Sequence, residues 1–235
     1  VAVACVKWGS KYGSAYVNRL ARAVAAHLAS PPHEFICFTD DAAGIDARRV
    51  RTEPLPSEAR RLRGWWQKAS LFSPQAAQVF AGRRVLYLDL DTVIVGGIGE
   101  AVALCSSAFA TLSARGMANE RRTCGYNSSV MAWQSPPPPP RAADRRGELE
   151  GIYTFLVGAA GAVATVTRKF DHWLEMCVEG AVLLQDALPC GYIAEYRSML
   201  PGDSAPCGAR IVTFPLQPKP HECGGWVRDA WTRHD

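Results

Sequence analysis

Apolar residues in the first forty positions fall into short continuous runs separated by one segment with helical spacing. Residues 1–6 form an apolar run ended by a Gly/Ser signal, which predicts a buried strand. Residues 16–28 carry apolar side chains at helical spacing, and two prolines end that pattern. Residues 35–38 form a second apolar run. The order strand, helix, strand is typical of a parallel α/β sheet.

The rest of the chain continues this alternation, and its strongest strand prediction is residues 85–88, directly before Asp89-Leu90-Asp91. The other predicted elements are a helical segment at 70–80, strands at 109–112 and 128–133, a helix at 170–184 and a last strand at 211–214. We therefore expect an α/β protein with a mostly parallel central sheet flanked by helices.

A run of five prolines followed by an arginine-rich stretch interrupts this pattern at residues 136–146. Proline removes a backbone donor and fixes φ, so this segment predicts an exposed, extended loop. We favour a surface insertion over a partner-binding polyproline segment, because the flanking strands read as one domain. With 235 residues, the sequence predicts a single domain over 1–235.

Composition narrows the classes of partner. The formal net charge is +4 and the basic residues are scattered, so we expect no nucleic-acid partner. No apolar stretch is long enough to span a bilayer, and residues 1–6 lack the flanks of a signal peptide. The eight cysteines form no CxxC pair, and Cys5 and Cys37 read as buried thiols. We expect a cytoplasmic protein without a transmembrane segment.

The candidate chemistry centres on Asp89 and Asp91, at the carboxyl end of a predicted buried strand. Ligands bind at that edge of open α/β sheets. In regular strand geometry the two side chains share a face, and we expect the Asp91 side chain to face solvent. Mg²⁺ and Mn²⁺ take one or two carboxylates together with substrate phosphates. The alternative is a pair of strand-end aspartates that cap the next turn.

Three further segments surround this pair in a characteristic order. They are Gly64-Trp65-Trp66-Gln67-Lys68-Ala69-Ser70-Leu71-Phe72 upstream, Tyr126-Asn127-Ser128-Ser129-Val130-Met131 downstream, and Arg210-Ile211-Val212-Thr213-Phe214-Pro215-Leu216-Gln217-Pro218-Lys219-Pro220-His221-Glu222 near the end. Together with the DxD, they resemble glycosyltransferases of the A-type fold, in particular the glycogenin-like and lipopolysaccharide-type enzymes of family 8. The resemblance implies a single domain that transfers a sugar from a nucleotide-sugar donor, a UDP-sugar, to a glycan, protein or small-molecule acceptor.

The resemblance also implies roles for individual residues. Asp89 and Asp91 match the metal-binding pair, with Asp89 also reaching the ribose, and the metal is Mn²⁺ or Mg²⁺. The other donor-binding positions are Val6 and Lys7 at the uracil, Tyr12 against the base, Lys68 near the sugar and phosphates, Asn127 and Ser128 at the sugar, and Lys219 at the pyrophosphate. Taken alone, Tyr12 reads equally well as a core or surface tyrosine, and Lys68 as a solvated helix lysine.

Two departures from the family pattern leave roles open. The family's third metal ligand is a histidine where this chain has Thr213 and Pro215, and His221 is our candidate replacement over a surface histidine. The family's Asp-Gln pair has no counterpart in residues 151–156. The catalytic residue is therefore unknown, with Asp171 and Asp186 as the candidates and Glu195 also considered; each alternatively reads as a helix-surface or capping carboxylate. Retention or inversion stays open.

Two other functions compete. Asp89-Leu90-Asp91-Thr92-Val93 after an apolar strand also resembles the first motif of haloacid-dehalogenase phosphatases, with Asp89 as nucleophile. That motif normally opens its domain, whereas here 88 residues precede it. The missing Asp-Gln pair favours, instead, a catalytically weak protein that binds nucleotide sugars.

Overall fold

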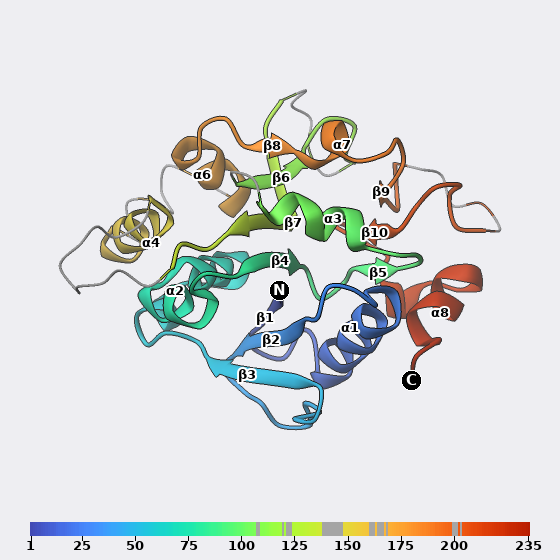
Figure 1. Ribbon diagram of the computed structural model, residues 1–235, viewed down its shortest axis with the longest axis horizontal. Helices are drawn as coiled ribbons and strands as arrows, with labels where there is room; N and C mark the ends of the chain where they lie inside the picture. Colours follow the sequence, from blue (N-terminus) through green and yellow to red (C-terminus); the bar gives the residue numbers. More distant parts are fainter. Residues whose placement is uncertain are drawn as a thin grey trace.

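The computed structural model describes residues 1–106, 109–118, 120, 124–137, 148–159, 163, 167, 169–198, 202 and 204–235. Its strands form a seven-stranded sheet and a three-stranded sheet, with helices around them (Figure 1). This arrangement confirms the predicted mixed α/β architecture with a mostly parallel central sheet.

The large sheet has the strand order β3-β2-β1-β4-β7-β6-β8. Its strands are β1 (Ala2–Lys7), β2 (Glu34–Thr39), β3 (Val50–Pro54), β4 (Arg84–Leu88), β6 (Ala110–Ser113), β7 (Tyr126–Gln134) and β8 (Val182–Leu183). Strand β7 is antiparallel to both of its neighbours, whereas the other neighbouring pairs are parallel. The first residues of β7 therefore lie beside the last residues of β4, and the Asp89 amide donates to the Ser129 carbonyl at 2.9 Å.

The small sheet has the order β5-β10-β9, with β5 (Val93–Ile94), β10 (Ile211–Thr213) and β9 (Ile193–Glu195). Strand β5 follows β4 after a turn through Asp89 and Asp91, so this turn connects the two sheets. Strand β10 pairs antiparallel with β5 and parallel with β9, which brings the C-terminal third of the chain to the DxD.

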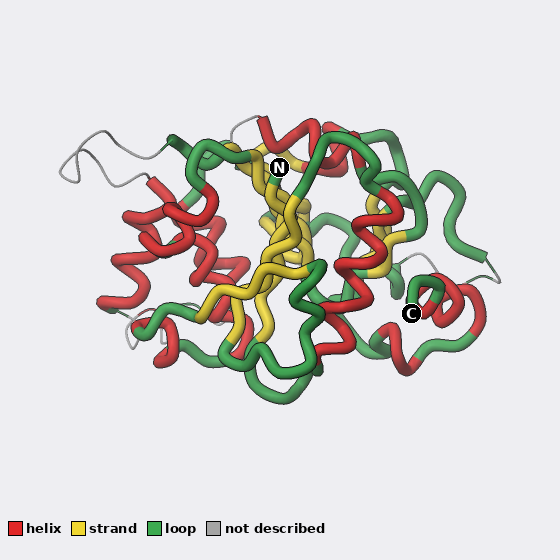
Figure 2. The backbone as a smooth tube through the Cα atoms, turned by 60° about the horizontal axis from the view of Figure 1, so that its bottom comes forward, coloured by secondary structure: helices red, strands yellow, loops and turns green. Residues whose placement is uncertain are grey.

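Helices cover both faces of the large sheet, as Figure 2 shows. The α-helices are α1 (Ser14–His27), α2 (Pro74–Phe80), α3 (Gly99–Ala103), α4 (Glu148–Gly158), α6 (Phe170–Cys177), α7 (Leu184–Ala187) and α8 (Gly225–Thr232), and the 3₁₀ helices are η1 (Glu58–Arg61), η2 (Gly64–Phe72), η3 (Leu104–Ser106) and η4 (Pro220–Glu222). Val3 and Cys5 of β1 join the core under α1 and α3, whereas Ala4 and Val6 join the core under α2 and α6. A strand buried on both faces needs a continuous apolar run, which is why β1 could be predicted.

The structure corrects several predicted boundaries. The DxD strand ends at Leu88, and Asp89 to Asp91 form a turn in place of regular strand geometry. The helix expected at 70–80 is a 3₁₀ helix from Gly64 followed by α2, and the helix expected at 170–184 ends at Cys177. In the predicted proline loop at 136–146, Pro136 and Pro137 are exposed, and 138–146 lie outside the described residues.

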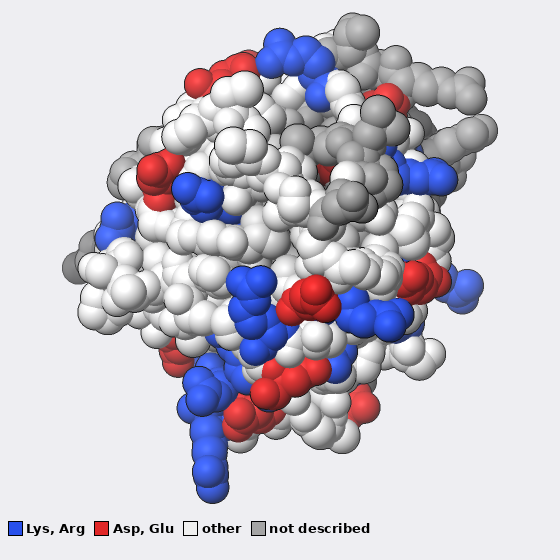
Figure 3. All heavy atoms as spheres, turned by 90° about the vertical axis from the view of Figure 1, so that its right-hand side faces the viewer, with Lys and Arg blue, Asp and Glu red and all other residues white. Residues whose placement is uncertain are grey.

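The distribution of surface charge and the state of the cysteines agree with the expectations from the composition. Lys and Arg side chains are interspersed with Asp and Glu on the face that carries α8 (Figure 3). All eight cysteines are free, and Cys5 and Cys37 are buried as expected. Among the described helices, none combines the length and apolar character that a membrane crossing requires.

Candidate active site

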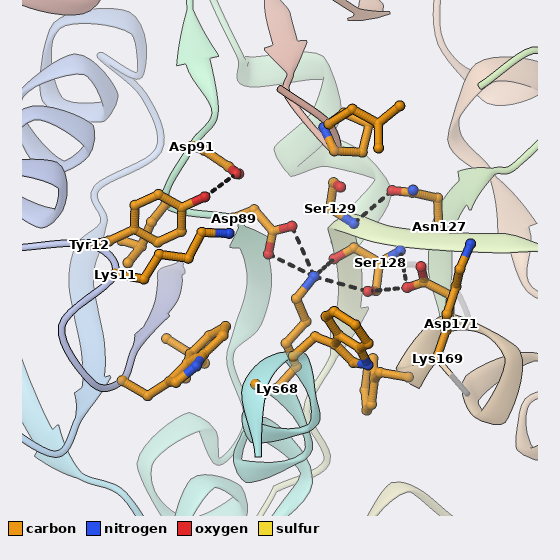
Figure 4. A pocket seen from close by; sticks show the side chains of 18 of the residues that line it. Lys11, Tyr12, Lys68, Asp89, Asp91, Asn127, Ser128, Ser129, Lys169 and Asp171 are labelled. Carbon is orange, nitrogen blue, oxygen red and sulfur yellow. Dashed lines mark hydrogen bonds and ion pairs between the residues drawn. The ribbon is translucent and has the colours of Figure 1, made fainter. Parts of the chain in front are cut away.

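A cavity of about 480 Å³ opens where β1 and β4 end and β7 begins. Parallel strands place their carboxyl ends at one edge, and the reversed β7 adds its own first residues there. Figure 4 shows side chains from these strands, from η2 and from α6 converging on this space. The sequence-predicted residues that line it are Val6, Tyr12, Lys68, Asp89, Asp91, Asn127, Ser128, Asp171 and Lys219.

Asp89 is held from two sides. Lys68 Nζ lies 2.8 Å from its Oδ1 and 2.9 Å from its Oδ2, and the Tyr87 hydroxyl donates to Oδ1 at 2.6 Å. Lys68 also donates to the Ser128 hydroxyl at 3.0 Å, and its side chain is 8% exposed. It is therefore not the solvated helix lysine of the alternative reading. Burial raises the pKa of the Asp89 carboxyl, and the Lys68 ammonium opposes that shift.

Asp91 is buried, with 8% of its surface exposed, which contradicts the expected solvent-facing side chain. Its Oδ2 accepts hydrogen bonds from the Tyr12 hydroxyl at 2.7 Å and from Lys219 Nζ at 2.7 Å. Lys219 also donates to the Phe214 carbonyl. Burial and the neighbouring Asp91 carboxylate raise the pKa of the Tyr12 hydroxyl, so this group remains a hydrogen-bond donor at neutral pH.

Asp171 joins the site from the first turn of α6. Its Oδ1 accepts the Ser128 amide at 3.0 Å and also the Ser128 hydroxyl. Asn127 Oδ1 accepts the Ser129 amide at 3.0 Å, a contact within the first residues of β7. These contacts align the start of β7 with α6 and leave Asp171 Oδ2 without a hydrogen bond from the described residues.

The other two candidate carboxylates lie outside the cavity lining. Asp186 pairs with Arg115 at 3.0 Å at the surface, where both side chains are more than half exposed. Glu195 accepts the backbone amides of Ala118, Arg197 and Ser198, which is the work of a loop-capping residue. The structure therefore separates Asp171 from the other two candidates.

Lys7 and His221 do not line the cavity either. Lys7, the last residue of β1, is buried, and its Nζ donates to the Asp41 carbonyl at 3.0 Å. His221 is exposed, and its Nδ1 is hydrogen-bonded to the Tyr16 hydroxyl. In the part of the chain that the structure describes, no three His, Cys, Asp or Glu side chains form a group that could hold a metal ion. His221 as third ligand stays a prediction.

The donor set fits a hard divalent ion that a substrate completes. Asp91 Oδ1 accepts no hydrogen bond from the described residues and faces the cavity with Asp89. Mg²⁺ and Mn²⁺ are held by one or two carboxylates together with substrate phosphates and water, so two aspartates suffice without a third protein ligand.

Trp8, Lys11, Trp65 and Lys169 also line the cavity, although the sequence patterns assigned none of them a role. Trp65 is 53% exposed, whereas its neighbour Trp66 packs edge-on against Phe170 and Trp173 in the core. Side chains three apart eclipse in a 3₁₀ helix, so Trp65 lies over the same face as Lys68. The spacing would have revealed this relation only if the 3₁₀ helix had been predicted.

Comparisons with known proteins place the fold. No family model and no curated protein matches the sequence. Among solved structures, the galactosyltransferase LgtC, in complex with donor and acceptor sugar analogues, matches 99% of this chain and 94% of its own, with a TM-score of 0.59 and 12% identity. The apo glycosyltransferase GlyE of Streptococcus pneumoniae TIGR4 matches 99% of this chain with a TM-score of 0.67 and 13% identity.

The chain spans 59% of GlyE and 46% of WbbM, a bifunctional glycosyltransferase that matches 94% of this chain with a TM-score of 0.59 and 10% identity. At such low identity, the likeness concerns the fold. The likeness gives no support to the haloacid-dehalogenase interpretation. That motif would place Asp89 after the first strand of the domain, whereas Asp89 follows β4 here. The chain has the glycosyltransferase A-type fold.

Proposed function

We propose that this protein is a metal-dependent glycosyltransferase that takes its sugar from a UDP-sugar donor. The observation that carries the proposal is the convergence of two carboxylates, Asp89 and Asp91, and two ammonium groups, Lys68 and Lys219, on one cavity. A nucleoside diphosphate bound with a divalent cation needs both kinds of group. The A-type glycosyltransferase fold supports the same conclusion.

The roles follow from position. Val6, at the end of β1, and Tyr12 line the part of the cavity that we assign to the uracil ring. Lys219 is assigned to the diphosphate, because an ammonium is a compact point charge suited to phosphate oxygens. Asp89 and Asp91 would hold Mn²⁺ or Mg²⁺, which would neutralise the charge that develops on the departing diphosphate.

Asp171 is our candidate for the residue nearest the transferred sugar. Its Oδ1 is committed to Ser128, and its Oδ2 is available to a sugar hydroxyl or to the acceptor hydroxyl. A general base must lie within hydrogen-bond reach of the proton that it removes, and a carboxylate oxygen that accepts no hydrogen bond from the described residues meets the chemical requirement. The stereochemical outcome and the acceptor are not assigned.

A second candidate function is a protein that binds nucleotide sugars without efficient transfer. The residue after Asp171, where the family pattern leads us to look for a glutamine, is His172, and its Nε2 lies 2.9 Å from Glu120 Oε2. The imidazole is thus occupied by a protein contact. Hydrolysis of the donor to free sugar and nucleotide distinguishes an active enzyme from this binding protein.

The proposal is tested by thermal unfolding with a panel of UDP-sugars, with and without Mn²⁺. A ligand that binds the native state stabilises it by about 2.7 kcal/mol at a concentration one hundred times its Kd. We expect the midpoint to rise with at least one UDP-sugar and to rise further when Mn²⁺ is added. No shift with any UDP-sugar, in the presence of Mn²⁺, would rule out this donor class.

A further inference from the structure

One oxygen atom of Asp91 accepts hydrogen bonds from two side chains. Its Oδ2 accepts the Tyr12 hydroxyl and the Lys219 ammonium, each at 2.7 Å. The Lys219 and Asp91 side chains are only 7% and 11% exposed, so water screens this ion pair weakly. Asp91 belongs to the pair that the proposed function assigns to the metal ion, and the inference below rests on that assignment.

An ammonium on Oδ2 and a divalent cation on the open Oδ1 cannot share the Asp91 carboxylate at low cost. Both would lie within a few ångströms of each other, and like charges repel strongly in a weakly screened site. Either Lys219 leaves Asp91 Oδ2 when the metal ion binds, or the metal ion binds beside the ammonium and is repelled by it. The first arrangement needs a new partner for the ammonium.

Lys219 has the freedom to make that exchange. Its backbone is fixed, because its amide donates to Glu222 at 2.6 Å where η4 begins. Its side chain is a flexible four-carbon stem, and Lys219 lines the same cavity as Asp91. The ammonium can therefore turn from Asp91 toward a diphosphate in the cavity without moving the main chain.

Lys68, the other lysine of the site, is held differently. Its ammonium lies within 3.0 Å of both Asp89 oxygens and of the Ser128 hydroxyl, so it is anchored by the turn after β4 and by strand β7. Lys219 has one carboxylate contact, on the atom that it shares with Tyr12, and one carbonyl contact to Phe214. The two lysines are therefore not equivalent.

We propose that Lys219 competes with the divalent cation for Asp91, and that its ammonium transfers to the diphosphate when nucleotide and metal bind. The metal alone then binds weakly, because the displaced ammonium would keep the Phe214 carbonyl as a partner but would lose its carboxylate. The diphosphate removes this competitor, so nucleotide and metal strengthen each other's binding. This coupling is reciprocal by thermodynamic linkage.

The test is Mn²⁺ binding to the full chain, followed by electron paramagnetic resonance, first without nucleotide and then with saturating UDP. The variant is Lys219→Met, which keeps the length of the stem and removes the charge. The matched control is Lys11→Met, since Lys11 lines the same cavity and lies over the Tyr12 ring at 5.0 Å. It reports the general loss of one positive charge.

We expect Lys219→Met to bind Mn²⁺ without nucleotide at least about tenfold more tightly than the wild type, and Lys11→Met to stay within about twofold. The factor by which UDP strengthens Mn²⁺ binding should fall in Lys219→Met. Lys219→Gln, which retains a polar end, should show the same direction of change and serves if the methionine variant fails to fold by circular dichroism.

Unchanged or weaker Mn²⁺ binding in both Lys219 variants would overturn the competition, since the metal would then not meet the ammonium. A gain of equal size in Lys11→Met would also overturn it and assign the effect to overall charge. Failure of the proposed function has a separate signature: neither the wild type nor any variant would bind Mn²⁺, even with UDP present.

Discussion

Two pairs of oppositely charged side chains line the cavity. Lys68 lies against Asp89, and Lys219 lies against Asp91, at 2.8 Å and 2.7 Å. All four side chains are at least four-fifths buried, so each charge depends on its partner. Removing one member of a buried pair leaves the other charged and desolvated, at a cost of about 3–5 kcal/mol. These residues consequently contribute to stability as well as to the proposed chemistry.

Lys68→Met is predicted to lower the free energy of unfolding by about 3–5 kcal/mol, because among the described residues Asp89 would keep only the Tyr87 hydroxyl as a donor side chain. Urea unfolding measures the change. Lys11→Met is the control, and it should lose no more than about 1 kcal/mol, the size of its cation–π contact with Tyr12. Equal urea midpoints for the two variants would contradict the importance of the buried pair.

At the scale of elements, η2 places two cavity residues, the exposed Trp65 and the buried Lys68, close together. The helix begins at Gly64, whose φ is +60°, a conformation that other residues adopt at a cost. The 3₁₀ spacing then puts Trp65 and Lys68 on one face, while Trp66 packs toward α6. The start of this helix therefore sets the direction of both side chains.

Gly64→Ala is predicted to destabilise the protein by about 1–2 kcal/mol, the cost of a left-handed conformation at an L-residue. A Cβ at this position meets no atom within 4 Å, so the effect comes from the backbone alone. Gly151→Ala, inside α4 and also in open space, should instead stabilise the protein by about 1 kcal/mol. Thermal unfolding of both variants checks the opposite signs, and a destabilised Gly151→Ala together with a neutral Gly64→Ala would contradict this account.

Sequence patterns predicted the long and buried elements and missed short or exposed ones. The apolar run of β4 was visible because every residue from Val85 to Leu88 is buried. Strands β5 and β9 were missed because two or three residues show no periodicity, and β3 because its side chains are largely exposed at the edge of the sheet. The helix at 170–184 was predicted too long, since Gly180, with φ +65°, follows its actual end.

Site residues could be predicted from the sequence only where they belong to a recognisable motif. Asp89, Lys68 and Lys219 were found through the order of their segments, and all three reach one cavity. Trp65 lies in the segment that also contains Lys68 but was assigned no role there, and Lys169 lies in no motif. Their positions depend on how η2 and α6 pack, which the sequence pattern does not specify. The burial of Asp91 was also missed, because it arises from Tyr12 and Lys219, which are far from it in the sequence.

At the scale of the whole molecule, long-range contacts join the small sheet to the large one. Lys219, which follows β10, reaches Asp91, and His221 reaches Tyr16 of α1. Arg19 of α1 forms a two-bond ion pair with Asp235, and its guanidinium lies over Trp231 of α8. We therefore propose that residues 1–235 fold as one cooperative unit.

Equilibrium unfolding in urea tests this unit. Far-ultraviolet circular dichroism reports on the helices, which lie largely around the large sheet, and tryptophan fluorescence includes Trp226 and Trp231 of α8. A cooperative domain gives coincident transitions by both probes. Two separated transitions would contradict the proposal and would indicate that the C-terminal segment unfolds on its own.

The central claim, that the cavity binds and activates a UDP-sugar through a metal held by the two aspartates, is tested most directly by the release of UDP. The measurement is Mn²⁺-dependent hydrolysis of a panel of UDP-sugars by the wild type and by Asp91→Asn, with folding of the variant confirmed by its thermal midpoint. We predict that the wild type releases UDP from at least one donor only when Mn²⁺ is present. In Asp91→Asn the rate should fall at least about a hundredfold, a difference of about 2.7 kcal/mol in transition-state stabilisation. Release of UDP by the variant at the wild-type rate, or by the wild type without any divalent cation, would contradict the account.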